Sequence, residues 1–138
     1  MSETSALKKS LPAMEYSFSL INEEGNLTKK SFEGNFTCRI SNLKMQAQIE
    51  KFRATLDGGI DGLDLGIRRL HAMLAYLKFT LTDSPKWWKD SDYGYELLDI
   101  SIVETVYNKV LKFEKDWVES IWGKPESEEV VPSETKEG

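Results

Sequence analysis

The stretch Asp83-Ser84-Pro85-Lys86-Trp87-Trp88 constrains the fold of this chain more than any other part of the sequence. Because the residue before a proline is pushed out of helical geometry, Pro85 ends the apolar helix that precedes it. Adjacent side chains diverge by about 100° on a helix and point to opposite faces of a strand, so one face of a regular element cannot bury both indoles. Either this connection is packed on two sides, or one tryptophan is presented to a partner.

Two helices are predicted before the tryptophans. The first begins at a cap formed by Ser41 or Asn42 and ends at Gly58-Gly59. Its apolar stripe consists of Met45, Ile49, Phe52 and Leu56. The second covers residues 65–81 after a cap at Asp64. Its wide apolar arc predicts a central position with neighbours on more than one side.

A third helix is predicted after the tryptophans. Asp99 is its expected cap, and Gly123 with Pro125 ends it. Its apolar stripe consists of Ile102, Val106, Val110, Phe113, Trp117 and Ile121. The opposite face is charged, so one face of this helix is predicted to lie on the core and the other in water.

Three short strands are predicted near the N-terminus. The alternating apolar residues of the first are Tyr16, Phe18 and Leu20. Two glycine turns, Glu24-Gly25-Asn26 and Glu33-Gly34-Asn35, delimit a second strand over 28–32 and a third over 36–40. The helices would cover the apolar face of such a meander. We therefore predict an α+β fold, with a small N-terminal antiparallel β-meander of about three strands packed against a mainly helical, three-helix domain.

The chain is predicted to form one domain with two loose ends. Residues 1–13 are expected to be a flexible arm, residues 14–122 a single domain, and residues 123–138 a disordered acidic tail. The single cysteine excludes an internal disulfide. A net charge of −5 argues against a broad phosphate-binding surface, and no run approaches the ~18 apolar residues that span a bilayer. Neither nucleic acid nor a membrane is expected as a partner, and a cytoplasmic location is predicted because the first residues lack a signal-peptide pattern.

No residue pattern in the sequence predicts catalysis. His71 is the only histidine and Cys38 lies on an apolar strand face, so both are expected to be structural. The acid-and-glycine segment 57–64 does not have the spacing of an EF-hand, and turn and cap duties account for its aspartates. Nucleotide-binding loops and nucleophile elbows are absent from the sequence. We therefore expect no enzymatic activity, no metal and no cofactor.

The aromatic residues are the remaining functional signal. Tryptophan and tyrosine are enriched at binding hot spots because they bury a large area at a low entropic cost. The same residues could instead cap a small core. Trp117 lies on the stripe of the third helix, so Trp88 or Trp122 is expected to be more exposed than Trp117. The candidate partner-binding residues are Trp87, Trp88, Tyr93, Tyr95 and Trp122.

Several segments resemble tail assembly chaperones of long-tailed bacteriophages. These segments are FEGNFTCRI at 32–40, LDGG at 56–59, a leucine-bearing helix over 74–81 followed by DSPKWW at 83–88, VYNKV at 106–110 and FE at 113–114, ahead of a short acidic tail. The resemblance covers roughly residues 30–122. It implies a protein without enzymatic activity that acts in the bacterial host cytoplasm.

The resemblance implies that the client is the aggregation-prone tape-measure protein and that the chaperone helps to recruit tail tube subunits. In many such phages a ribosomal frameshift also yields a minor, longer form. We expect the client's apolar stripes to enter a groove between the central and last helices, rimmed by Trp87, Trp88, Tyr93 and Tyr95. The net negative charge would keep the complex dispersed, and self-association is also expected.

Two other classes of protein stay open. A structural head–tail connector or tail completion protein would remain in the virion, whereas a chaperone is absent from the finished particle. A small enzyme or regulator is the third hypothesis, and a thermal-shift screen with metals and nucleotides would test it.

Overall fold

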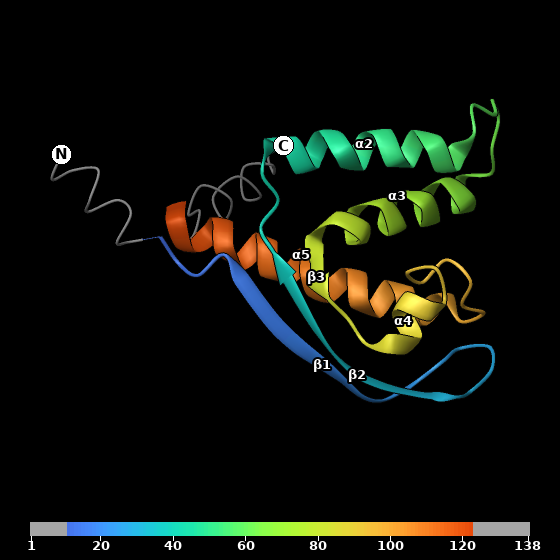
Figure 1. Ribbon diagram of the computed structural model, residues 1–138, viewed down its shortest axis with the longest axis horizontal. Coiled ribbons are helices and arrows are strands. Elements are labelled where there is room, and N and C mark those ends of the chain that lie inside the picture. Colours follow the sequence, from blue (N-terminus) through green and yellow to red (C-terminus); the bar gives the residue numbers. More distant parts are fainter. Residues whose placement is uncertain (1–10, 123–138) are drawn as a thin grey trace, which may run out of the picture.

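The computed structural model describes residues 11–122, and the chain there forms a three-stranded antiparallel sheet with four helices (Figure 1). The predicted α+β class is confirmed. Residues 1–10 of the predicted arm and the predicted tail over residues 123–138 lie outside the described residues.

A long β-hairpin opens the fold. Strand β1 (Glu15–Glu24) pairs antiparallel with β2 (Ser31–Arg39), which places Leu20 opposite Gly34. The turn predicted at Glu33-Gly34-Asn35 is therefore wrong, and the two strands predicted around it are one strand. A side chain at Gly34 would collide with the ring of Pro85, so this glycine marks a close approach of two segments and not a turn.

The first helix begins and ends where the sequence predicts, whereas the second begins as predicted but ends at Thr80, ahead of Pro85, because Leu81–Asp83 pairs with β2 as a strand. Asn42 caps α2 (Leu43–Asp57), and its side chain accepts a hydrogen bond from the backbone N–H of Met45. Gly58, in the left-handed conformation, ends that helix, and Asp64 caps α3 (Leu65–Thr80). The third strand of the sheet comes later than predicted, because β3 (Leu81–Asp83) follows α3 and pairs with β2.

The two tryptophans lie on a short helix, α4 (Lys86–Asp90), at a place where a loop was expected. Pro85 stands at its N-cap, where a proline costs no hydrogen bond. Trp88 points into the core, whereas Trp87 lies half-buried on the hairpin and its Nε1–H donates to the carbonyl oxygen of Glu33 at 2.7 Å. This segment is therefore packed on two sides, which is the first of the two alternatives that the sequence left open.

One hydrophobic core lies between the sheet and the helices α3 and α5 (Ile100–Trp122), while α2 lies farther out and packs on α3 (Figure 1). The buried residues of this core are Phe18, Leu20, Phe36, Cys38, Met73, Leu74, Leu77, Trp88, Ile102, Val103, Val106 and Val110. All the buried residues of α5 lie in its first half, so its C-terminal half is only partly covered.

The predicted capping role of Asp99 is wrong. Its buried carboxylate accepts hydrogen bonds from the β1–β2 loop: from the backbone N–H of Leu27 at 2.6 Å, and from the backbone N–H and hydroxyl of Thr28 at 2.7 and 2.6 Å. Asn26 caps α5 instead, because its Oδ1 accepts a hydrogen bond from the backbone N–H of Ser101. The loop thus folds over the start of α5 and takes the place of a local cap.

Candidate functional site

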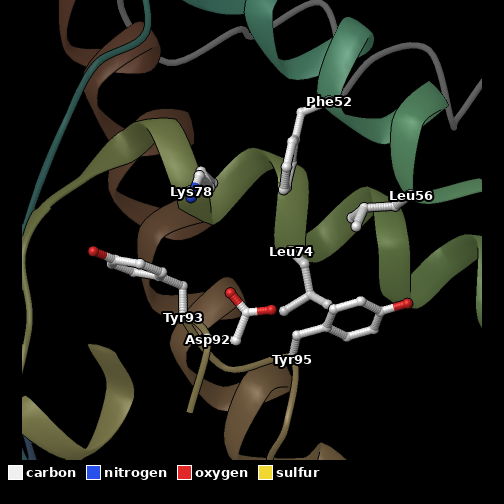
Figure 2. A pocket seen from close by; sticks show the side chains of 7 residues that line it. All are labelled: Phe52, Leu56, Leu74, Lys78, Asp92, Tyr93 and Tyr95. Atoms are coloured by element: carbon white, nitrogen blue, oxygen red, sulfur yellow. The ribbon is translucent and has the colours of Figure 1, made fainter. Parts of the chain in front are cut away.

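A cleft lies between α2, α3 and the loop that follows α4 (Figure 2). We call it the aromatic cleft, and its lining residues are Phe52, Leu56, Leu74, Lys78, Asp92, Tyr93 and Tyr95. Its inner space is small, about 30 Å³, which is close to the volume of one water molecule. A larger hollow of about 340 Å³ adjoins it toward β3 and α4, and Lys78 and Tyr93 line both spaces.

Helix α2 forms one wall of the cleft and is weakly covered. None of its residues is buried, and among the described elements only α3 packs closely on it. Its predicted apolar stripe is confirmed as the face toward α3, but the side chains on it are only half-buried. In Figure 2, Phe52 and Leu56 reach from α2 toward Leu74 of α3. The cleft thus has an apolar wall that remains partly accessible to a partner.

The opposite wall is a loop held in an uncommon conformation. Asp92, Tyr93 and Gly94 all have positive φ, at 56°, 55° and 92°. For residues other than glycine this costs roughly 1–2 kcal/mol each, so the surrounding packing must enforce it. A Cβ atom at Gly94 would lie 2.7 Å from the ring of Trp88. The buried tryptophan is therefore the base on which the Tyr93 and Tyr95 loop rests.

The side chain of Lys78 lines both spaces and contacts two aromatic rings. Its Nζ lies 4.5 Å from the ring centroid of Tyr93 and 5.3 Å from that of Phe52. Such cation–π contacts are worth roughly 0.5–1 kcal/mol each at exposed sites. Lys78 therefore links α2, α3 and the loop with weak contacts.

A chain of hydrogen bonds centred on the buried His71 fixes one end of the cleft. His71 Nδ1 lies 2.7 Å from Oδ1 of Asp57, and His71 Nε2 lies 2.7 Å from the hydroxyl of Tyr95. Because a carboxylate only accepts, His71 Nδ1–H donates to Asp57, and Nε2 makes the hydrogen bond with the hydroxyl of Tyr95, which can donate or accept. All three groups are then satisfied, and Tyr95 is held in place by α2 and α3 together.

Sequence reasoning missed this chain because it looked for partners of His71 close by in the sequence. Asp57 ends α2, and His71 lies in the second turn of α3. Two antiparallel helices joined by a short glycine linker bring such positions side by side. That hairpin geometry was the signal that could have revealed the pair, whereas nothing in the sequence indicated Tyr95 as the third member.

The structure places the predicted partner-binding residues in four different environments. Tyr93 and Tyr95, which are 43% and 40% exposed, rim the aromatic cleft. Trp122 is 81% exposed and lies at the far end of α5, away from the cleft. Trp87 is half-buried on the hairpin. Trp88 is 1% exposed and lies in the core, so the prediction that Trp88 or Trp122 would be more exposed than the half-buried Trp117 holds for Trp122 and not for Trp88.

The position predicted for the groove needs correction. We expected it between the central and last helices, but α3 and α5 pack directly on each other through the rings of Tyr76 and Tyr107 and an ion pair between Arg69 and Glu104. The residues that line the aromatic cleft come from α2, α3 and the 92–95 loop, on the side of α3 that faces α2. The predicted stripe of α2 is therefore a wall of the cleft.

Two observations on the described residues concern metal binding and the thiol of Cys38. Within residues 11–122, no cluster of three or more His, Cys, Asp or Glu side chains could hold a metal ion. Burial raises the pKa of Cys38 to about 11, so its thiol is protonated at neutral pH. The side chains that line the cleft offer apolar and aromatic contact beside one lysine, Lys78, and one aspartate, Asp92.

Comparison with known proteins adds no relative. The chain matches no protein-family model, no curated protein and no solved structure at a significant level. None of the helices between residues 11 and 122 is long and apolar enough to cross a membrane.

Proposed function

We propose that this protein is a tail assembly chaperone that covers an apolar helical segment of the tape-measure protein in the bacterial host cytoplasm. The observation that carries the proposal is the aromatic cleft: partly exposed apolar residues on α2 face a tyrosine-bearing loop that rests on the buried Trp88. The identity of the client comes from the resemblance to tail assembly chaperones. The recruitment of tail tube subunits is proposed on the same resemblance.

The chemistry of the cleft suits one face of an amphipathic helix. Such a helix presents apolar side chains at intervals of three and four residues, and a groove between helices takes them as anchors. The larger hollow has room for a bulky anchor and is bordered by Lys78 and Lys89. Lys89 lies 3.7 Å from Asp83, which also lines the hollow, so a client helix with a leucine or aromatic residue beside an acidic one would match the apolar floor and Lys78.

The binding test is co-expression with the tape-measure protein, scored by the soluble fraction of the client. Tyr93→Asn removes the rim ring and its contact with Lys78, and asparagine tolerates the left-handed backbone at this position. Leu111→Asn is the matched control, because Leu111 on α5 is 40% exposed and does not line the cleft. We expect Tyr93→Asn to lower the soluble client several-fold and Leu111→Asn to leave it unchanged.

Two outcomes would contradict the proposal at different levels. If Tyr93→Asn keeps the client soluble as well as the parent does, the cleft is not the binding site. If the parent itself gives no more soluble client than an empty vector, the chaperone function is wrong. Mass spectrometry of purified virions separates the structural alternative, because a head–tail connector would be found in the particle.

A further inference from the structure

The hydrogen-bond chain at one end of the aromatic cleft has the arrangement of an activated nucleophile. The hydroxyl of Tyr95 lies 2.7 Å from Nε2 of His71, and Nδ1 of the same ring lies 2.7 Å from Oδ1 of Asp57. A nucleophile, a base within hydrogen-bond reach of it, and a third group that orients the base are the parts of a nucleophilic site. Serine or cysteine is the usual first member, and here a tyrosine occupies that position.

The histidine of this chain is placed to act as the base. His71 is 4% exposed, so water does not compete freely for its ring nitrogens. Asp57 accepts from Nδ1–H, and when the ring is neutral this leaves Nε2 as the acceptor for the hydroxyl proton of Tyr95. The rings of His71 and Tyr95 meet edge to face with their centroids 5.5 Å apart. The position of the imidazole is therefore set by contacts on both of its nitrogens.

The charges around the imidazole suit a proton transfer. A carboxylate beside Nδ1 stabilises the imidazolium that forms when Nε2 takes up a proton, and Asp57 supplies that carboxylate. Nη1 of Arg53 lies 3.8 Å from the other oxygen of Asp57, while Nη2 of Arg53 lies 2.6 Å from Glu50. Because the guanidinium is shared between two carboxylates and is closer to Glu50, the negative charge of Asp57 remains available to His71.

The tyrosine of this chain is partly open to solvent. Tyr95 is 40% exposed and lines the aromatic cleft (Figure 2). The inner space of the cleft measures only about 30 Å³, so a group transferred to Tyr95 must be small or must extend into solvent. Leu56 and Leu74 line the same space, and such apolar surroundings suit a small uncharged acyl group.

We propose that Tyr95 is a site of acylation that takes the acyl group of small activated donors, with His71 as its general base and Asp57 as the positioning residue. In this step Oη of Tyr95 attacks the carbonyl carbon of the donor and passes its proton to Nε2 of His71. The bond between the carbonyl carbon and the leaving group then breaks, and the proton moves from Nε2 to the leaving group. The product is a tyrosine ester. The inference does not depend on the proposed chaperone function.

The test is acetylation of the full chain with N-acetylimidazole, whose leaving group is imidazole. Peptide mass spectrometry measures the rate at each tyrosine. Tyr16 and Tyr93 are matched internal controls, because they are 44% and 43% exposed and the single histidine of the chain has both ring nitrogens engaged by Asp57 and Tyr95. A positioned general base contributes roughly 10²- to 10⁴-fold, so we expect Tyr95 to react at least about 10-fold faster than either control.

Two variants and a pH series assign the effect to the imidazole. His71→Gln removes the base and should lower the rate at Tyr95 to that of the controls, while unchanged rates at Tyr16 and Tyr93 show that the fold is kept. Asp57→Asn keeps an oxygen that accepts from Nδ1–H but removes the charge that stabilises the imidazolium, so it should slow Tyr95 several-fold. In the parent, the ratio of the Tyr95 rate to the Tyr16 rate should fall as the pH is lowered, because an imidazolium cannot accept a proton.

Three results would overturn the inference. Tyr95 could react no faster than Tyr16 and Tyr93, which would leave the hydrogen-bond chain a structural contact between α2, α3 and the loop. His71→Gln could keep both the control rates and the fast reaction at Tyr95, which would separate the reactivity from the imidazole. If His71→Gln unfolds the chain, the pH series of the parent decides, and a ratio of the Tyr95 and Tyr16 rates that does not change with pH would contradict the proposal.

Discussion

Removal of the Trp88 side chain tests the role that the structure gives to this residue. The indole is 1% exposed, lies edge-on to Phe36 with ring centroids 5.6 Å apart, and supports Gly94 beneath the cleft loop. Replacing a buried tryptophan by alanine costs about 3–5 kcal/mol, a large share of the 5–15 kcal/mol by which a domain is stable. For a domain of this size, about 4 °C of melting temperature corresponds to each kcal/mol, so Trp88→Ala should melt about 12–20 °C below the parent.

Urea unfolding and thermal melts of three variants provide the measurement. Trp122→Ala is the control, because an 81% exposed side chain should change the unfolding free energy by no more than about 0.5 kcal/mol. Trp87→Ala should fall between the two, since it loses partial burial and one hydrogen bond to Glu33. The reasoning fails if Trp88→Ala melts within about 2 °C of the parent, or if Trp122→Ala is the more damaging change.

Three further predictions concern single positions. Gly94→Ala should destabilise the chain by about 1–3 kcal/mol in urea unfolding, because φ is 92° there and the new Cβ would lie 2.7 Å from the Trp88 ring; an unchanged midpoint would contradict this. Burial alone would raise the pKa of Asp99, but the hydrogen bonds from the β1–β2 loop have the larger effect and lower this pKa below its ordinary value of 3.8. The ionised Asp99 should therefore stabilise the fold above pH 3.8, and this stabilisation should be lost as the pH falls through the lower pKa of the folded state. Acid titrations of the parent and of Asp99→Asn should therefore converge at low pH, and a constant gap would refute the linkage. The Cys38 thiol, whose pKa burial raises to about 11, should react with a thiol reagent at pH 8 at least roughly 100-fold more slowly in the folded chain than in urea, and equal rates would show that it is accessible.

The parts of the fold that follow from local chemistry could be predicted from the sequence. Asn42, Gly58 and Asp64 each act on backbone groups within a few residues, so their capping roles are visible in the order of amino acids alone. The spacing of apolar residues along each helix likewise predicted which face of the helix packs on its neighbours, because this spacing is local in the sequence. The α+β class followed because a hairpin with one apolar face needs helices to cover it.

The parts that failed depend on residues distant in the sequence. Gly34 looked like a turn because the ring of Pro85, which packs on it, comes 51 residues later in the chain. Asp99 looked like a local cap because its partners, Leu27 and Thr28, lie more than 70 residues earlier. No local rule distinguishes a glycine that bends the chain from one that lets another segment approach it.

The same dependence affects the candidate site. Tyr93 and Tyr95 were identified as partner-binding candidates from residue type, but their place on a cleft wall depends on Trp88 and Gly94. The two adjacent tryptophans were informative about packing, because Trp88 supports the loop at Gly94 and Trp87 packs on the hairpin. Whether the cleft receives a client stays a prediction that the Tyr93 variant tests.

The hydrogen bonds between Asn26 and Ser101 determine how late in synthesis the fold can be completed. The two residues are 75 positions apart, and each donates its backbone N–H to the side chain of the other. After the hairpin has left the ribosome, α2 and α3 must still be translated before Asn26 in the β1–β2 loop can bond to Ser101. Until then the apolar side of the nascent hairpin lacks its final cover, so an early stop codon ahead of α5 should yield an aggregating product rather than a smaller folded one.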